Sequence, residues 1–148
     1  AEAKGGVIAI IPIASRQGKI AGQNMATVEE SEMREYEGGI PMNSMSLAGI
    51  PTISVGLTDP KENVDQYEVL QKYKPADNVY RKIVLKDNVI QGGIFVTEID
   101  RAGIITGLIR DEVDVSPFKD KLMEDNFGLI SLPKNYRKHK VQGPGIEI

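Results

Sequence analysis

The sequence predicts an α+β fold: a leading helix, then a small antiparallel sheet of three to five strands with one or two helices packed on it. Three observations lead to this prediction. Helical spacing appears near the start, short β-prone runs separated by turn residues fill the middle, and helical spacing returns after residue 100. Elements in this order favour a layer of helices on one face of a sheet.

The leading helix is expected over residues 15–26. It follows Pro12 and an apolar run at 7–11, which we interpret as a short buried strand or a loop. Glycine inside a helix costs up to about 1 kcal/mol relative to alanine, so two glycines four residues apart indicate close approach of a neighbouring surface. We call the set to which they belong the small-residue face: Ala14, Gly18, Ala21, Gly22 and Met25.

The acidic residues 27–37 are expected to form a solvated connection to the sheet. The predicted strands cover residues 52–57, 66–73, 80–85 and 89–97. Asp87-Asn88 tolerates the left-handed conformations of a two-residue turn, which predicts a hairpin between the last two strands. Gly92-Gly93 in the returning strand indicates a bulge or a close backbone approach.

Two helical segments are expected after the hairpin. Asp100 is the candidate N-cap of the first, and Ser116 is the candidate N-cap of the second. We expect four apolar residues to dock the segment that follows, before a basic tail with loosely ordered last residues. These anchors are Phe127, Leu129, Ile130 and Leu132.

Composition excludes several classes of site. The 148 residues carry a net charge of −3, which gives no drive toward nucleic acid, and hold no cysteine for a disulfide or a thiolate metal site. The single histidine, His139, lies in the basic tail and is interpreted as a surface residue. No metal site is predicted, and no run of apolar residues is long enough to span a membrane. We therefore expect a cytoplasmic setting, with neither nucleic acid nor membrane as a partner.

Four stretches together resemble one enzyme family. They are IPIASRQGKIAGQNMA, YEGGIPMNSMSLAGIPTISVGLTDP, VYRKIVLKDNVIQGGIFVTEIDRAGIITGLIR and DVSPFKDKL. In this order they resemble the C-terminal part of FAD-dependent pyridine nucleotide-disulfide oxidoreductases. The branch they are most similar to contains NADH oxidases, the nitrite reductase flavin subunit and rubredoxin reductases.

The resemblance implies three regions. Residues 1–37 would be the last segment of a split FAD-binding domain plus a connector, 38–125 a C-terminal α+β domain of the interface or dimerisation type, and 126–148 a tail. The helix start would face the pyrimidine end of the flavin, where Ile13 and Ala14 are the candidate cofactor-binding residues. A helix dipole favours the negative charge that a reduced flavin carries there. No catalytic residue is assigned to this chain.

The resemblance also implies a function for the parent enzyme, which would transfer hydride from NAD(P)H to FAD and then pass electrons to an acceptor. The Gly-Asp pair and both dinucleotide-binding motifs of the family are absent from these residues. We therefore expect FAD and NAD(P)H domains upstream as partners, and no stable cofactor binding or catalytic competence by the chain alone. The resemblance allows a homodimer.

Two other functions are compatible with the residues themselves. The chain could be a non-catalytic α+β module that self-associates, which a tight dimer indifferent to flavin would favour. It could also be an anion-binding regulator that uses the basic residues between Lys134 and Lys140.

Overall fold

The computed structural model describes residues 2–3, 6–36, 38–134 and 136–137. The chain divides into two compact units, Ala1–Asn43 and Ser44–Ile148. Each unit is described by itself. The domain boundaries expected from the sequence stay a prediction. His139 and the last residues of the tail lie outside the described residues.

The first unit is built on α1 (Ile11–Ala26), which is preceded by a two-stranded antiparallel pair, β1 (Glu2–Ala3) and β2 (Gly6–Val7). Pro12 lies in the first turn, where its missing N–H costs nothing, so the helix begins four residues earlier than predicted. Of the two interpretations of the run at 7–11, the loop is correct: β2 ends at Val7, which is 69% exposed, and residues 8–10 belong to no helix or strand.

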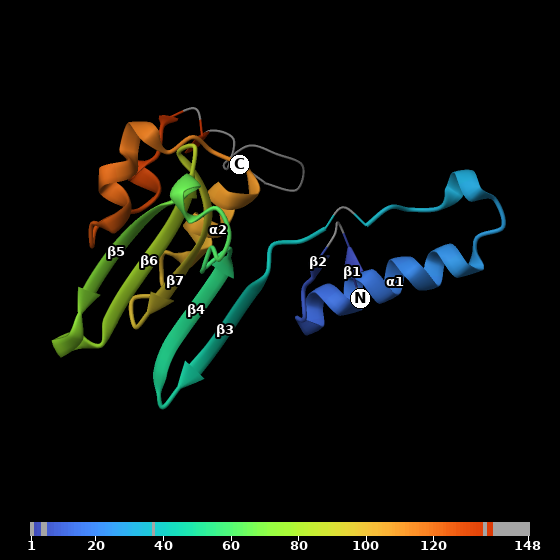
Figure 1. Cartoon of the computed structure of the whole chain (residues 1–148), viewed down its shortest axis with the longest axis horizontal. Helices are drawn as coiled ribbons and strands as arrows, with labels where there is room; N and C mark the ends of the chain where they lie inside the picture. The colour runs from blue at the N-terminus through green and yellow to red at the C-terminus, as the bar shows by residue number, and fades with distance from the viewer. Residues whose placement is uncertain (1, 4–5, 37, 135, 138–148) are drawn as a thin grey trace, which may run out of the picture. The chain divides into compact units, whose positions relative to one another are not determined.

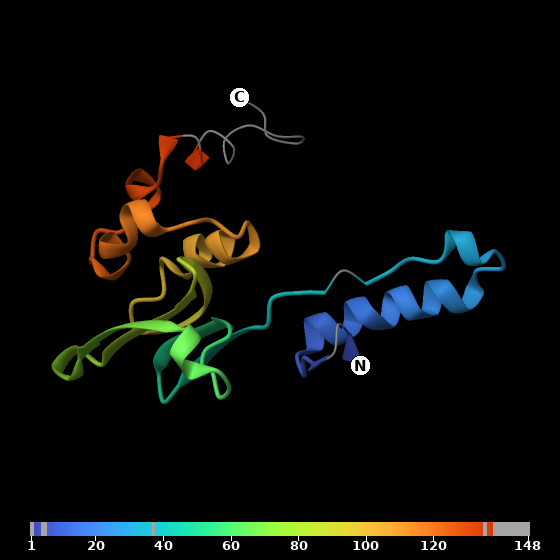
Figure 2. The same ribbon diagram turned by 45° about the horizontal axis from the view of Figure 1, so that its top comes forward.

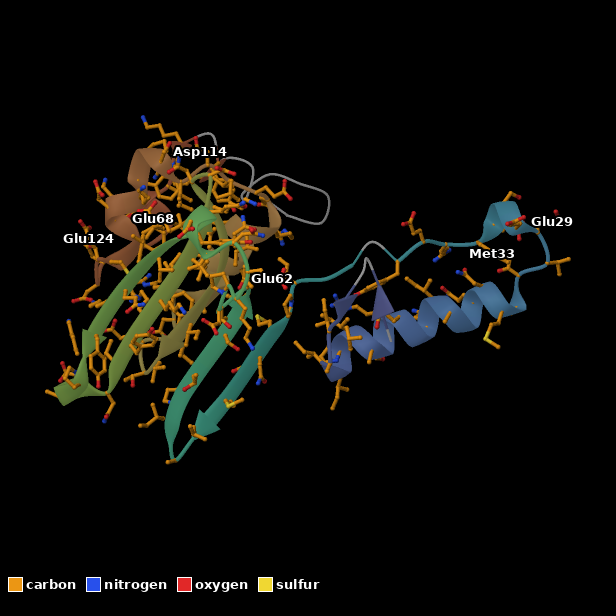
Figure 3. All side chains as sticks on the ribbon, viewed as in Figure 1. Glu29, Met33, Glu62, Glu68, Asp114 and Glu124 are labelled. Carbon is orange, nitrogen blue, oxygen red and sulfur yellow. The ribbon has the colours of Figure 1, made fainter. Side chains whose placement is uncertain are left out.

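A returning segment covers one face of α1. After the short 3-10 turn η1 (Glu30–Glu32), flanked by Glu29 and Met33 beyond the end of α1 (Figure 3), the chain runs back along the helix (Figure 1). The side-chain amide of Asn24 fixes it by donating to the Arg34 carbonyl at 2.8 Å and accepting from the Arg34 N–H at 2.9 Å. Residues 28–35 of the acidic connection are exposed, as expected from its charge.

The second unit contains a five-stranded antiparallel sheet of order β3-β4-β7-β6-β5 (Figure 1). The predicted α+β class is confirmed, with a sheet at the upper end of the expected size. The first strand of this sheet, β3, was not among the strand ranges predicted from the sequence. The strand bounds are β3 (Met42–Leu47), β4 (Ile50–Gly56), β5 (Glu68–Lys74), β6 (Val79–Lys86) and β7 (Val89–Val96).

One face of the sheet carries the helical layer (Figure 2). It consists of α2 (Ala102–Arg110), which packs on β7 and β4, and the 3-10 segments η4 (Ser116–Met123) and η5 (Leu129–Ser131). The core lies between them. Its fully buried large side chains include Ile83, Leu85, Ile90, Phe95, Ile105, Leu108, Leu122 and Phe127.

The predicted hairpin is confirmed. Asp87 and Asn88 adopt φ values of 51° and 60°, as a two-residue turn with left-handed residues requires. Both readings of the glycine pair are also right, because the register shifts beside Gly92, and Gly92 lies against the chain that leaves β4. A Cβ on Gly92 would overlap the backbone of Leu57, so no larger residue fits.

Both N-cap predictions are wrong. Helix α2 begins after Arg101, which has no side-chain cap, and Asp100 lies one residue earlier. The N-cap position of η4 is Val115. The side chain that accepts a first-turn N–H is Asp114, which receives the Ser116 N–H at 2.8 Å. The second helical segment is 3-10 rather than α, with a kink at Phe118.

Two of the four predicted apolar anchors dock. Phe127 and Leu132 are 1% and 2% exposed. Leu129 and Ile130 lie in η5 between them and are 54% and 81% exposed. A short 3-10 turn cannot direct four nearby side chains to one side, because its three residues per turn distribute them around the axis.

Candidate functional site

The candidate cofactor-binding residues, Ile13 and Ala14, lie in the first turn of α1 and differ in burial. The Ile13 side chain is 5% exposed, and its Cδ1 would be 3.4 Å from a Cβ placed on Gly39 of the returning segment. Ala14 is exposed. Ile13 therefore anchors the helix start within its unit, and Ala14 contributes to the surface. Their role toward a flavin stays a prediction.

The backbone of this turn is already partly bonded. The N–H groups of Ile13 and Ala14 donate to the Ile10 carbonyl at 3.1 and 2.9 Å. Pro12 has no N–H. Ile11 is the first residue of α1 and is 86% exposed, and its N–H is one of the first helical N–H groups, which have no intrahelical acceptor.

The electrostatics of the helix start favour an electronegative atom. Its N-cap residue, Ile10, offers no side-chain acceptor, and the first turn contains no acidic residue. The positive end of the helix dipole is therefore not neutralised by its own side chains. An incoming carbonyl or anion would meet no carboxylate in this turn.

The small-residue face of α1 is uncovered. Its five residues are exposed, Met25 by 88%. A Cβ placed on Gly18 or Gly22 would have no heavy atom of the described chain within 4 Å outside the helix itself. The returning segment instead covers the face that carries Ile13 and Gln17. The glycines thus have no packing role within the described residues.

Two shallow grooves lie beside α1, with volumes of about 450 and 370 Å³. They share Gln23 of the helix and Arg34 of the returning segment. The second is also lined by Arg16 and Lys19, together with Glu35, which balances part of their charge. Both grooves lie along the body and C-terminal half of α1 rather than at its start.

A second polar cluster, in the other unit, was missed by sequence reasoning. Arg81 on β6 is 2% exposed and donates to the carbonyls of Leu122 and Glu124 at 3.3 and 3.1 Å, and to the Glu98 carboxylate at 3.1 Å. Arg81 thereby ties the end of η4 to the sheet. Its signal in the sequence is a charged residue in phase with the buried Val79 and Ile83 of the same strand.

Lys72 on β5 extends this cluster. Its Nζ lies 3.7 Å from Glu98 and forms a close ion pair with Asp125, which Lys74 also pairs at 3.1 Å. Burial lowers the pKa of the Lys72 ammonium and of the Arg81 guanidinium, and the Glu98 carboxylate opposes both shifts. Three cations, two carboxylates and two backbone carbonyls thus join the segment after η4 to the sheet.

Neither a metal site nor a membrane span is found in the described part of the chain. Its Asp, Glu and His residues form no group of three or more that could hold a metal ion. None of its helices is long and apolar enough to cross a bilayer.

Comparison with known proteins finds a family model that matches the sheet-forming region. Residues 41–113 match the model of the rubredoxin NAD+ reductase C-terminal domain. The chain is 29% identical over 116 residues to the NADH-dependent phenylglyoxylate dehydrogenase subunit epsilon of Aromatoleum evansii, and 23% identical to a nitrite reductase [NAD(P)H] of Bacillus subtilis. Each alignment covers 78% of this chain, but only 26% and 14% of the relative.

A solved structure has the same fold. NADH:rubredoxin oxidoreductase from Clostridium acetobutylicum superposes with a TM-score of 0.52 at 22% sequence identity, over 76% of this chain and 28% of that one. The chain thus spans about a quarter of the length of the first relative and of this structure. The resemblance inferred from the sequence motifs is confirmed.

Proposed function

We propose that this chain is the C-terminal part of an NAD(P)H-dependent FAD oxidoreductase, because its residues 41–113 match the model of the rubredoxin NAD+ reductase C-terminal domain. In that enzyme FAD would accept hydride from NAD(P)H and pass the electrons to an acceptor. The chain would contribute the terminal helix of the FAD domain and the small domain that packs on the nucleotide-binding domains. Both relatives are named as NADH- or NAD(P)H-dependent enzymes, which supports the proposal.

The role proposed for the first unit rests on one observation, the uncovered small-residue face of α1. Two glycines interrupt this helix, yet nothing in the described chain makes use of their missing side chains. A helix can keep such a face when another surface packs against it. We infer that the upstream FAD domain supplies this surface, and that the helix start then points toward the flavin.

The residues at the helix start fit this role. The Ile11 N–H is the donor for a flavin carbonyl, and the Ile13 and Ala14 N–H groups add the positive end of the dipole behind it. Ile13 holds the turn in place through its buried side chain, while the exposed Ala14 methyl is small enough for close approach of a ring. The contribution is electrostatic and needs no reactive side chain.

The variant Ile11→Pro tests the helix start in the parent enzyme. Proline is well tolerated in the first turn but removes the N–H group, so the helix should form normally. We expect weaker FAD binding and a more negative flavin reduction potential, because the reduced, more negative form loses a donor. Ile11→Ala, which shortens the same side chain but keeps the N–H group, is the matched control. Equal potentials for Ile11→Pro and the unchanged enzyme would contradict the proposed contact.

The proposal as a whole is tested upstream of Ala1. Two G-x-G-x-x-G motifs in the same reading frame would establish the class of enzyme. The 148-residue chain alone is expected to bind FAD weakly, because its surface supplies only the helix start. Flavin co-purifying with this polypeptide at near-stoichiometric yield would contradict that expectation.

A further inference from the structure

We draw no further inference here: the strongest candidate, the shallow groove between α1 and the returning segment that Arg16, Lys19 and Arg34 line, carries nothing, because these side chains are exposed, a carboxylate lines the same groove, and nothing in the structure shows which ligand would bind there.

Discussion

Replacement of Arg81 by methionine tests whether the buried guanidinium fastens the C-terminal segment to the sheet. Methionine keeps most of the apolar stem and fills a similar space, but it removes all three hydrogen bonds. Of the acceptors, the Leu122 carbonyl is the buried one, whereas the Glu124 carbonyl and the Glu98 carboxylate are only partly buried. The three acceptors should therefore respond unequally.

The magnitude follows from the acceptors that remain. The buried Leu122 carbonyl, left without a donor, costs about 1–3 kcal/mol. The two partly buried acceptors each lose a charge-assisted hydrogen bond of about 1.5–3 kcal/mol, but water can hydrate them again and offsets most of that loss. The variant also removes the cost of burying a guanidinium, which opposes the loss. We expect a net decrease of about 2–3 kcal/mol in the free energy of unfolding, which is a large share of the roughly 5–15 kcal/mol typical of a domain.

Urea denaturation followed by far-ultraviolet circular dichroism measures this change, and tyrosine fluorescence provides a second probe because the chain contains no tryptophan. Lys82→Met is the matched control, since Lys82 is the next residue of β6, points to the opposite face and pairs with Asp59 at 3.8 Å near the surface. A surface pair of this kind contributes about 0–1 kcal/mol. The reasoning is refuted if Arg81→Met costs no more than Lys82→Met.

A double-mutant cycle isolates the ion pair within this total. Glu98→Gln keeps the shape of the acceptor but removes its charge, so the coupling energy between Arg81 and Glu98 should fall at about 0.5–3 kcal/mol. Hydrogen exchange should report faster opening of residues 118–127 in Arg81→Met than in the control. A uniform change over the whole sheet would show that the arginine acts on the core rather than on this segment.

Three further changes test single positions. Gly92→Ala should lower the free energy of unfolding by about 1–3 kcal/mol in urea, since its Cβ overlaps backbone, whereas Gly103→Ala, with open space around it, should be neutral or stabilising. Gly18→Ala should raise the free energy of unfolding by up to about 1 kcal/mol in this chain and increase its helix content, yet weaken FAD binding in the parent enzyme. Stronger FAD binding would contradict the packing role. The hydrogen bond from the Ser116 N–H lowers the pKa of the Asp114 carboxyl. The ionised carboxylate therefore stabilises the fold at neutral pH, and this stabilisation is lost as the pH falls below the ordinary value of 3.8. Asp114→Asn should remove this part of the acid dependence of the free energy of unfolding.

The elements predicted correctly from the sequence are those encoded by neighbouring residues. Asp87 and Asn88 need only their own backbone preferences to form the turn, and the alternating apolar residues on either side fix the register around it. The α+β class follows from the order of such local patterns. The family resemblance came from motifs in order, and comparison with known proteins confirmed it independently of the coordinates.

The errors lie where distant segments meet. The cap of η4 was misassigned because Asp114 and Ser116 are equally plausible as sequence, and only the path of the chain decides that the Asp114 carboxylate accepts the Ser116 N–H. Leu129 and Ile130 look like anchors by composition, but the segment turns them outward. Strand β3 was not predicted by range because its serines and asparagine have weak strand preference until β4 pairs with it.

The candidate site shows the same difference between features encoded by neighbouring residues and features that depend on distant segments. The sequence by itself determined that a helix with two inner glycines begins near Pro12, because helical period and backbone preference are properties of adjacent residues. Only the tertiary structure decided that Ile13 is buried, that the small-residue face is open and that Arg81 reaches the carbonyls at the end of η4. Burial and hydrogen bonding depend on which segments arrive from elsewhere in the chain, and no local pattern specifies that arrival.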